Sequence, residues 1–400
     1  FYSRNIGLIN GKQVQLLGGA RMTGRIGKWD VGVLDMQTAE FDTIPGENFG
    51  VFRMRRQIIN QNSYVGGIVT SRIGLDGSCN LSYGMDGIIR LFGDDYLNLK
   101  WARNYDSKTD TRLNSLNPAF YMINWERRSR EGLGYNIDYI YSGKDFNPGT
   151  GFLLRHGVQG ADVNVLYGWM PGEKSKILRY GINFNSTLFK RLSDGSIETL
   201  ILNPFVDIGT KTGIYLNLGE QYQKISVLYD FNLSDRVIVF AGDYSFAQTI
   251  LRIFTTRNRT LSFMSEATFG QFYDGKITGV NFGPVINFSS SFNVNLNYSL
   301  NAIRFPERIS DNALNIRSIN AKALYMYSTK LSLSLFVQYM NTQGDFITNI
   351  RFRYNPREGN DLYLVYNDAR PLGESETSPV QPNFFNKTIM VKYVYTFTLK

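Results

Sequence analysis

The chain has 400 residues and a formal net charge of +9, and only 19% of its residues are charged. The basic side chains are dispersed along the chain, without a long Lys/Arg run, which argues against nucleic acid as a partner. One cysteine, Cys79, excludes an intramolecular disulfide, and one cysteine with one histidine excludes a structural zinc site of the Cys/His type. No apolar run reaches the roughly 18 residues that would predict a membrane-spanning helix.

Short segments that alternate apolar and polar residues follow one another from the start of the chain. In residues 13–27, Leu16 and Met22 alternate with Arg21 and Arg25. Successive side chains of a strand point to opposite faces, so this pattern predicts strands with one apolar and one polar face. The same alternation is found in residues 178–188, 291–300 and 389–399.

The number and length of these segments predict an all-β fold. We count roughly 20 strands (about 18–22) of about 10 residues, the pattern of a transmembrane antiparallel outer-membrane β-barrel. Aromatic residues make up 14% of the chain, as aromatic girdles at two membrane interfaces would require. No shift in composition divides the chain, so we expect residues 1–400 to form a single outer-membrane β-barrel domain. The expected location is the bacterial outer membrane.

Turns and loops of different length separate the predicted strands. Residues 27–28, 76–78 and 93–95 read as tight turns, whereas residues 106–118, 142–160 and 367–387 are long. Outer-membrane barrels have short periplasmic turns and long external loops, so we expect the long loops outside and the final strand to run inward. Residues 209–236 do not resolve clearly into strands.

A soluble β-sandwich or propeller is the alternative fold. Its outward face would be rich in Lys, Glu and Asp, whereas the polar face here consists mainly of Asn, Ser, Thr, Gly, Gln and Arg. A propeller would also repeat a signature every 40–50 residues or so, and we find none.

Charged residues on the polar strand faces are the candidate functional residues. With the apolar face toward lipid, they face the lumen. They give either an arginine-lined pore that favours anions or ion pairs that merely fill the lumen, and the sequence leaves both open. The candidates for pore lining are Arg21, Arg25, Arg53, Arg55, Arg72, Asp86, Arg90, Lys100, Arg179, Arg351, Arg353 and Lys392, and Glu126, Asp138, Asp162 and Asp207 share their pattern.

Two other features are candidate sites of chemistry. His156 is the only histidine, and no Gly-x-Ser-x-Gly elbow accompanies it, so we expect a loop residue rather than a catalytic one. The aspartates of residues 93–95 and 106–110 lack the ligand order of a calcium-binding loop, which favours plain turns. We therefore predict no catalytic residue, no metal site and no cofactor.

Several short motifs resemble a known family. They are Gly18-Gly19-Ala20-Arg21-Met22-Thr23-Gly24, Phe52-Arg53-Met54-Arg55-Arg56, Asp145-Phe146-Asn147-Pro148-Gly149 and Asn360-Asp361-Leu362-Tyr363. They are similar to the C-terminal barrel domain of a Bacteroidota outer-membrane family of unknown function. The resemblance implies a barrel that is often preceded by a carbohydrate-binding module like that of family 9, and no such module lies in these residues.

Three functions are compatible with such a barrel. The first is a channel or transport-type barrel with an arginine-rich lumen. The second is a non-transporting scaffold subunit of an assembly or secretion complex, and the third is a lipid- or glycan-modifying enzyme that uses His156. We expect outer-membrane lipid and lipopolysaccharide as partners, and also other outer-membrane or periplasmic proteins. Because residue 1 already lies in a patterned segment without a signal peptide, we expect a longer precursor.

Overall fold

The computed structural model describes residues 3, 5–9, 12–107, 115–234, 237–257, 259–310, 312–342, 344–371 and 386–396. Within these ranges the regular secondary structure is β, and 21 long strands follow one another in a sheet whose order is that of the chain. The prediction of an all-β fold with roughly 20 strands is therefore confirmed. In the described ranges, no helix has the length and apolar character needed to cross a membrane.

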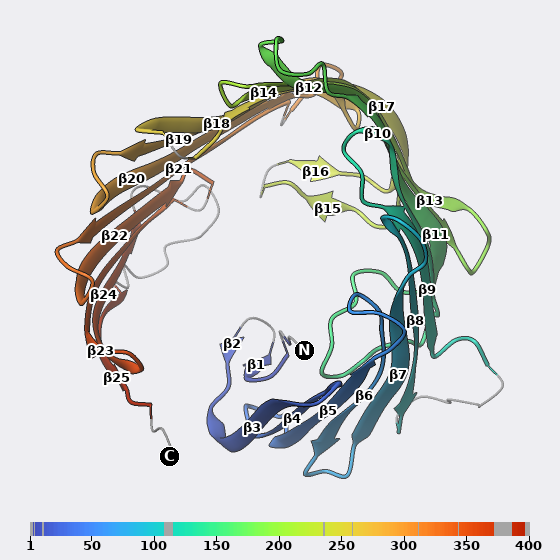
Figure 1. Ribbon diagram of the computed structural model, residues 1–400, viewed down its shortest axis with the longest axis vertical. Coiled ribbons are helices and arrows are strands. Elements are labelled where there is room, and N and C mark those ends of the chain that lie inside the picture. The colour runs from blue at the N-terminus through green and yellow to red at the C-terminus, as the bar shows by residue number, and fades with distance from the viewer. Residues whose placement is uncertain are drawn as a thin grey trace. The chain divides into compact units, whose positions relative to one another are not determined.

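The chain divides into two compact units. The first contains residues 1–168 and 183–202, and its consecutive strands pair antiparallel (blue to green in Figure 1). A two-residue pair, β1 (Leu8–Ile9) with β2 (Lys12–Gln13), precedes them. The long strands are β3 (Leu16–Ile26), β4 (Trp29–Thr38), β5 (Glu47–Gln57), β6 (Tyr64–Gly74), β7 (Cys79–Arg90), β8 (Asp95–Asp106), β9 (Ala119–Arg127), β10 (Gly132–Ser142) and nearly all of β11 (Val158–Trp169).

The second unit contains residues 169–182 and 203–400, and its strands also pair antiparallel in chain order (Figure 1). Both units share β12 (Ile177–Arg191) and β13 (Ile197–Thr210). The remaining strands are β14 (Ile214–Val227), the short pair β15 (Phe231–Asn232) and β16 (Ile238–Val239), β17 (Gly242–Thr255), β18 (Leu261–Phe272), β19 (Gly275–Asn287), β20 (Phe292–Arg304), β21 (Ala313–Met326), β22 (Leu331–Met340), β23 (Asp345–Arg357), β24 (Asn360–Pro371) and β25 (Asn386–Val394).

The two faces of each strand differ in chemistry, as the alternation predicts. In β5, Phe52 and Met54 are 44% and 38% exposed, and Arg53 and Arg55 lie on the other face. Large apolar side chains are exposed in this way along both units, for example Val69, Ile123 and Phe282. In water such a surface would favour aggregation, whereas lipid solvates it.

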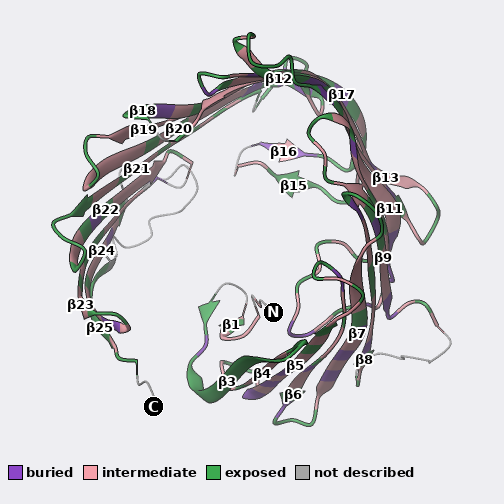
Figure 2. Ribbon diagram, in the orientation of Figure 1, coloured by how far each residue is buried: buried purple, intermediate pink, exposed green. Residues whose placement is uncertain are grey.

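The buried residues do not form one apolar core. Figure 2 shows buried residues as short bands scattered among the strands. Several of the most buried side chains are polar, including Asn104, Thr150 and Ser262. Interior polar groups of this kind are typical of a barrel whose inner face is polar, and they argue against a two-sheet sandwich with a dry core.

The structure gives different bounds for two of the predicted loops, residues 142–160 and 367–387, and it defines the strands in the unclear stretch 209–236. The stretch after β10 is shorter than residues 142–160, because β11 already begins at Val158, and it packs back on the polar face of β7 and β8. The unclear stretch 209–236 contains β14 and β15, and the loop that carries β15 and β16 buries Val237 against Ile303 and Phe305. Of residues 367–387, the first five extend β24, and residues 372–385 lie outside the described residues.

Candidate functional site: an arginine-lined pocket

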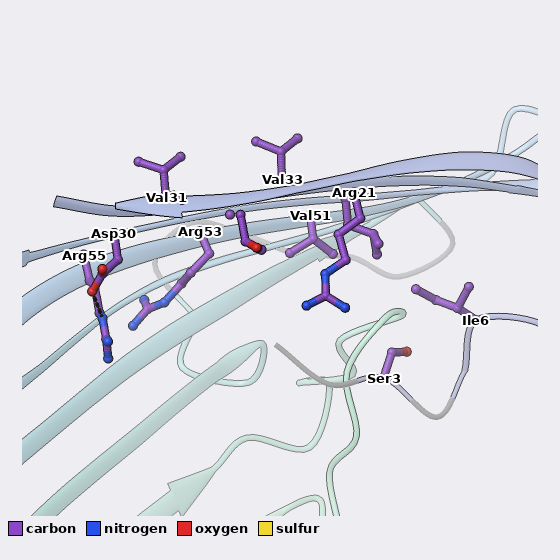
Figure 3. A pocket seen from close by; sticks show the side chains of 13 residues that line it. Ser3, Ile6, Arg21, Asp30, Val31, Val33, Val51, Arg53 and Arg55 are labelled. Carbon is purple, nitrogen blue, oxygen red and sulfur yellow. Dashed lines mark hydrogen bonds and ion pairs between the residues drawn. The ribbon is translucent and has the colours of Figure 1, made fainter. Parts of the chain in front are cut away.

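A cavity of about 610 Å³ lies on the polar face of β3, β4 and β5 in the first unit. Its lining includes Arg21, Arg53, Arg55 and Asp30, and these side chains project from one side of the strands (Figure 3). Val31 and Val33 project from the other side, as the alternation of β4 requires. The pocket volume is in the range of small-molecule sites.

The strand register explains why the predicted residues share this face. Residues that are directly paired across two strands point to the same side of a sheet. Arg25 of β3 is directly opposite Asp30 of β4, and Asp30 is opposite Arg55 of β5. Gly66 of β6 is opposite both Arg55 and Asp86 of β7. Asp86 is in turn opposite Lys100 of β8. The alternation within each strand then places Arg21, Arg25, Arg53, Arg55, Arg72, Asp86, Arg90 and Lys100 on one face of the first unit.

Carboxylates pair with most of these arginines. Asp30 accepts from Arg25 at 2.5 Å and from Arg55 at 2.6 Å, and Arg53 forms a two-fold contact with Asp86 that includes one bond of 2.7 Å. Bidentate pairs fix the guanidinium plane and so orient its remaining donors. Half-exposed ion pairs contribute little to stability, so their main effect here is to position charge.

Two further arginines on the same face also pair with carboxylates. The Glu47 carboxylate, 9% exposed, accepts from Arg72 at 2.8 Å, and Arg90 lies 3.4 Å from Asp94 in the next turn. Among the described residues, Arg21 and Lys100 have no carboxylate within ion-pair distance. The polar face therefore combines paired and unpaired cations, and neither of the two predicted arrangements describes it alone.

Gly66 in β6 makes the Arg53–Asp86 pair geometrically possible. Arg53 is on β5 and Asp86 on β7, so the guanidinium must cross the strand between them. A Cβ atom at position 66 would lie 3.0 Å from Arg53 Nη1 and 2.9 Å from the Arg55 Cβ. Because Gly66 has no side chain, the Arg53 guanidinium can cross β6 and reach the Asp86 carboxylate.

We expect Gly66→Leu to displace Arg53 and break its pair with Asp86. Inserting a side chain where backbone and packed atoms leave no space typically costs about 1–3 kcal/mol. The unfolding midpoint in denaturant, measured for the refolded protein in detergent, should fall accordingly. Gly67→Leu is the matched control, because its Cβ points to the other face and would meet only the Gly84 carbonyl oxygen, at 3.6 Å. Equal midpoints for the two variants would contradict this role of Gly66.

The remaining candidates for pore lining belong to the second unit. Arg353 is paired with Tyr363 and Tyr363 with Lys392, so Arg351, Arg353 and Lys392 share one face there. Arg353 donates to Asp361 at 2.6 Å, and Arg179 pairs with Asp207. These residues are not part of the pocket on β3–β5, and lining of a conducting pore by the whole set stays a prediction.

The sequence did not predict the part of the pocket that comes from the N-terminal segment, defined as residues 3 and 5–9. Ser3 and Ile6 line the cavity and lie opposite the arginines (Figure 3). Periodicity does not identify long-range partners for these residues, and Ser3 and Asn5 donate to carbonyl oxygens 147 and 144 positions away, in Thr150 and Gly149. Partners so far apart in the sequence cannot be predicted from a local pattern of residues.

The other candidate sites have ordinary structural contacts. His156 is exposed, and its Nδ1 lies 2.8 Å from the Phe146 carbonyl oxygen within the same loop. Asp95 accepts from Arg127 and from the Tyr135 hydroxyl. In the described part of the chain, no group of three or more His, Cys, Asp or Glu side chains is arranged to hold a metal ion.

The chain was compared with known proteins. No family model matches it, and no curated protein is similar in sequence. Among solved structures, it is similar to the siderophore receptor PirA from Pseudomonas aeruginosa, with a TM-score of 0.53 and 10% identity over 89% of this chain and 73% of the other. PirA from Acinetobacter baumannii gives a TM-score of 0.52 at 10% identity, over 92% and 74% of the two chains. The chain thus has the fold of a bacterial outer-membrane β-barrel, and its location is the outer membrane.

Proposed function

We propose that the protein is a transport-type outer-membrane barrel that passes small solutes and favours anions. The observation that carries the proposal is the excess of arginine over carboxylate on the polar face around the pocket. This face carries four arginines and two carboxylates, namely Arg21, Arg25, Arg53 and Arg55 with Asp30 and Asp86. Fixed positive charges along a pore raise the local concentration of anions. The likeness in fold to two siderophore receptors supports a transport role.

The first test is conductance in planar lipid bilayers. The purified full chain should insert and give discrete current steps, with a reversal potential in a salt gradient that indicates anion preference. A barrel without a continuous polar path would insert without current. Absence of current steps under every lipid and voltage condition, for protein shown to be folded, would contradict the proposal.

A scaffold role is the second candidate, because loops pack back on the polar face in both units. Residues 143–157 pack on β7 and β8, and the loop with β15 and β16 covers Ile303. Such loops can occupy a lumen and leave the apolar outer face as the working surface. We expect a scaffold to keep stable partners after extraction in mild detergent, whereas a lone monomer in every mild detergent would contradict this role. Contacts with lipid and lipopolysaccharide are proposed for the outer face in either case.

A further inference from the structure

The charge balance of the pocket leaves two positive charges uncompensated. Arg25 and Arg55 share the single carboxylate of Asp30, and Asp86 is bound to Arg53. Arg21 has no carboxylate partner among the described residues and is exposed to the cavity. Each guanidinium carries five donors, so donors remain for a ligand after these pairs are made. Two excess charges at separate positions match a ligand with two negative groups.

One side of the same pocket is apolar. Arg21 is paired with Leu34 across β3 and β4, and Leu34 with Val51 across β4 and β5. Val51 is already largely covered, at 6% exposed, whereas Leu34 and Ile6 are half-buried, and Ile6 approaches this side from the N-terminal segment (Figure 3). An inorganic ion would leave this apolar surface in contact with water. A ligand with a short hydrocarbon body between its charged ends would cover it.

The N-terminal segment forms the roof of the pocket, and hydrogen bonds to the loop between β10 and β11 hold it there. Ser3 Oγ donates to the Thr150 carbonyl oxygen at 2.6 Å, and Asn5 Nδ2 donates to the carbonyl oxygens of Gly149 and Gly151 at 3.1 and 2.6 Å. A half-buried amide that donates to two carbonyl oxygens restricts the position of its own backbone. Asn5 is therefore the main anchor of the roof.

The loop that receives Asn5 is itself fixed to a strand. Asn80 of β7 accepts from the Gly149 backbone N–H at 2.8 Å and donates to the Asn147 carbonyl oxygen at 3.0 Å. Asn104 of β8 accepts from the Asn147 backbone N–H at 3.0 Å. Two strand residues thus hold the loop, the loop holds Asn5, and Ile6 follows directly over the pocket. The roof has a defined place relative to β3–β5.

We infer that this pocket binds a small aliphatic dicarboxylate. One carboxylate lies at Arg21 and the other at Arg53 and Arg55, and the methylene chain packs on Leu34, Val51 and Ile6. The inference rests on the proposed function, since it names the class of solute for which the transport barrel has a binding site. Binding itself requires no passage of the solute through the protein.

Isothermal titration calorimetry of the full chain in detergent tests this, with glutarate as the probe and 1,5-pentanediol as its uncharged analogue. Glutarate should bind and pentanediol should not. Arg21→Ser should weaken glutarate binding about tenfold or more, because a charge-assisted contact is lost. Arg56→Ser removes the same charge from the same strand on the opposite face, where Arg56 stacks on Trp29, and should change the affinity by less than about twofold.

A second variant tests the pocket without changing its charge. A Cβ at Gly32 would lie 3.8 Å from Thr23 Cγ2 and 4.0 Å from the Arg53 Cβ, so Gly32→Leu should be accommodated and fill the cavity. Glutarate binding should then be lost with every arginine in place, while Gly67→Leu on the other face should bind as the wild type does. Asn5→Ala should weaken binding severalfold, because the roof loses its anchor.

Several results would overturn the inference. These are the absence of glutarate binding to folded wild-type protein, equal affinity of the wild type and Gly32→Leu, or equal effects of Arg21→Ser and Arg56→Ser. An unchanged affinity in Asn5→Ala would overturn the role of the roof. A barrel that conducts ions but binds no glutarate contradicts the pocket inference alone. A barrel that binds glutarate but never conducts contradicts the proposed transport function alone.

Discussion

Replacing Arg53 and Arg55 together by serine should remove most of the anion preference of the barrel. The change removes two positive charges and also leaves Asp86 without its described partner and Asp30 with Arg25 alone. A unit charge at about 4 Å from a permeating ion in water is worth about 1 kcal/mol, which is about fivefold in local ion concentration. Arg21 and Arg25 then balance Asp30 and Asp86, so the reversal potential in a salt gradient across a planar bilayer should move toward zero.

The control for this experiment is Arg56→Ser, which removes one arginine from the same strand. Arg56 lies over the Trp29 ring on the apolar face, at 5.2 Å from its centroid. Its loss should leave the reversal potential unchanged. High salt should reduce the difference between the double variant and the wild type, because the screening length falls from about 10 Å at 0.1 M salt to about 3 Å at 1 M. A double variant with the selectivity of the wild type would show that the pocket does not face the ion path.

A charge introduced on the apolar face should have the largest effect on stability. Val280 lies in the middle of β19, is 36% exposed, and is paired with Ala267 and Leu300 on that face. An arginine at the bilayer midplane of such a barrel costs about 2–4 kcal/mol. We expect Val280→Arg to lower the unfolding free energy by this amount when the protein is refolded into lipid vesicles and titrated with denaturant.

The neighbouring residue provides the matched control. Asn281 is on the opposite face of β19, paired with Glu266 and Ser299. Asn281→Arg places the same side chain beside a carboxylate on the polar face, so the unfolding free energy should change by less than about 1 kcal/mol. If both variants were equally destabilised in vesicles, the assignment of the two faces to lipid and lumen would be wrong.

The strands and their faces could be predicted because both depend on neighbours in sequence. Alternation in β5 follows directly from the pattern of Phe52, Arg53, Met54 and Arg55, since a strand turns successive side chains to opposite sides. A barrel repeats this rule in every strand, so the pattern also predicts the fold. The stretch 209–236 gives a weaker pattern, because after β14 the chain leaves the regular sheet and forms the short strand β15.

The sequence by itself determined that this chain is a barrel with an arginine-rich polar face, because the period of two is a local property. Only the tertiary structure decided which carboxylate each arginine meets, since Arg53 reaches Asp86 across Gly66 on a strand between them. It also decided that the N-terminal segment covers the pocket. Asn5 bonds carbonyl groups 144 and 146 residues away, and contacts at such separations depend on the register of all the strands between them.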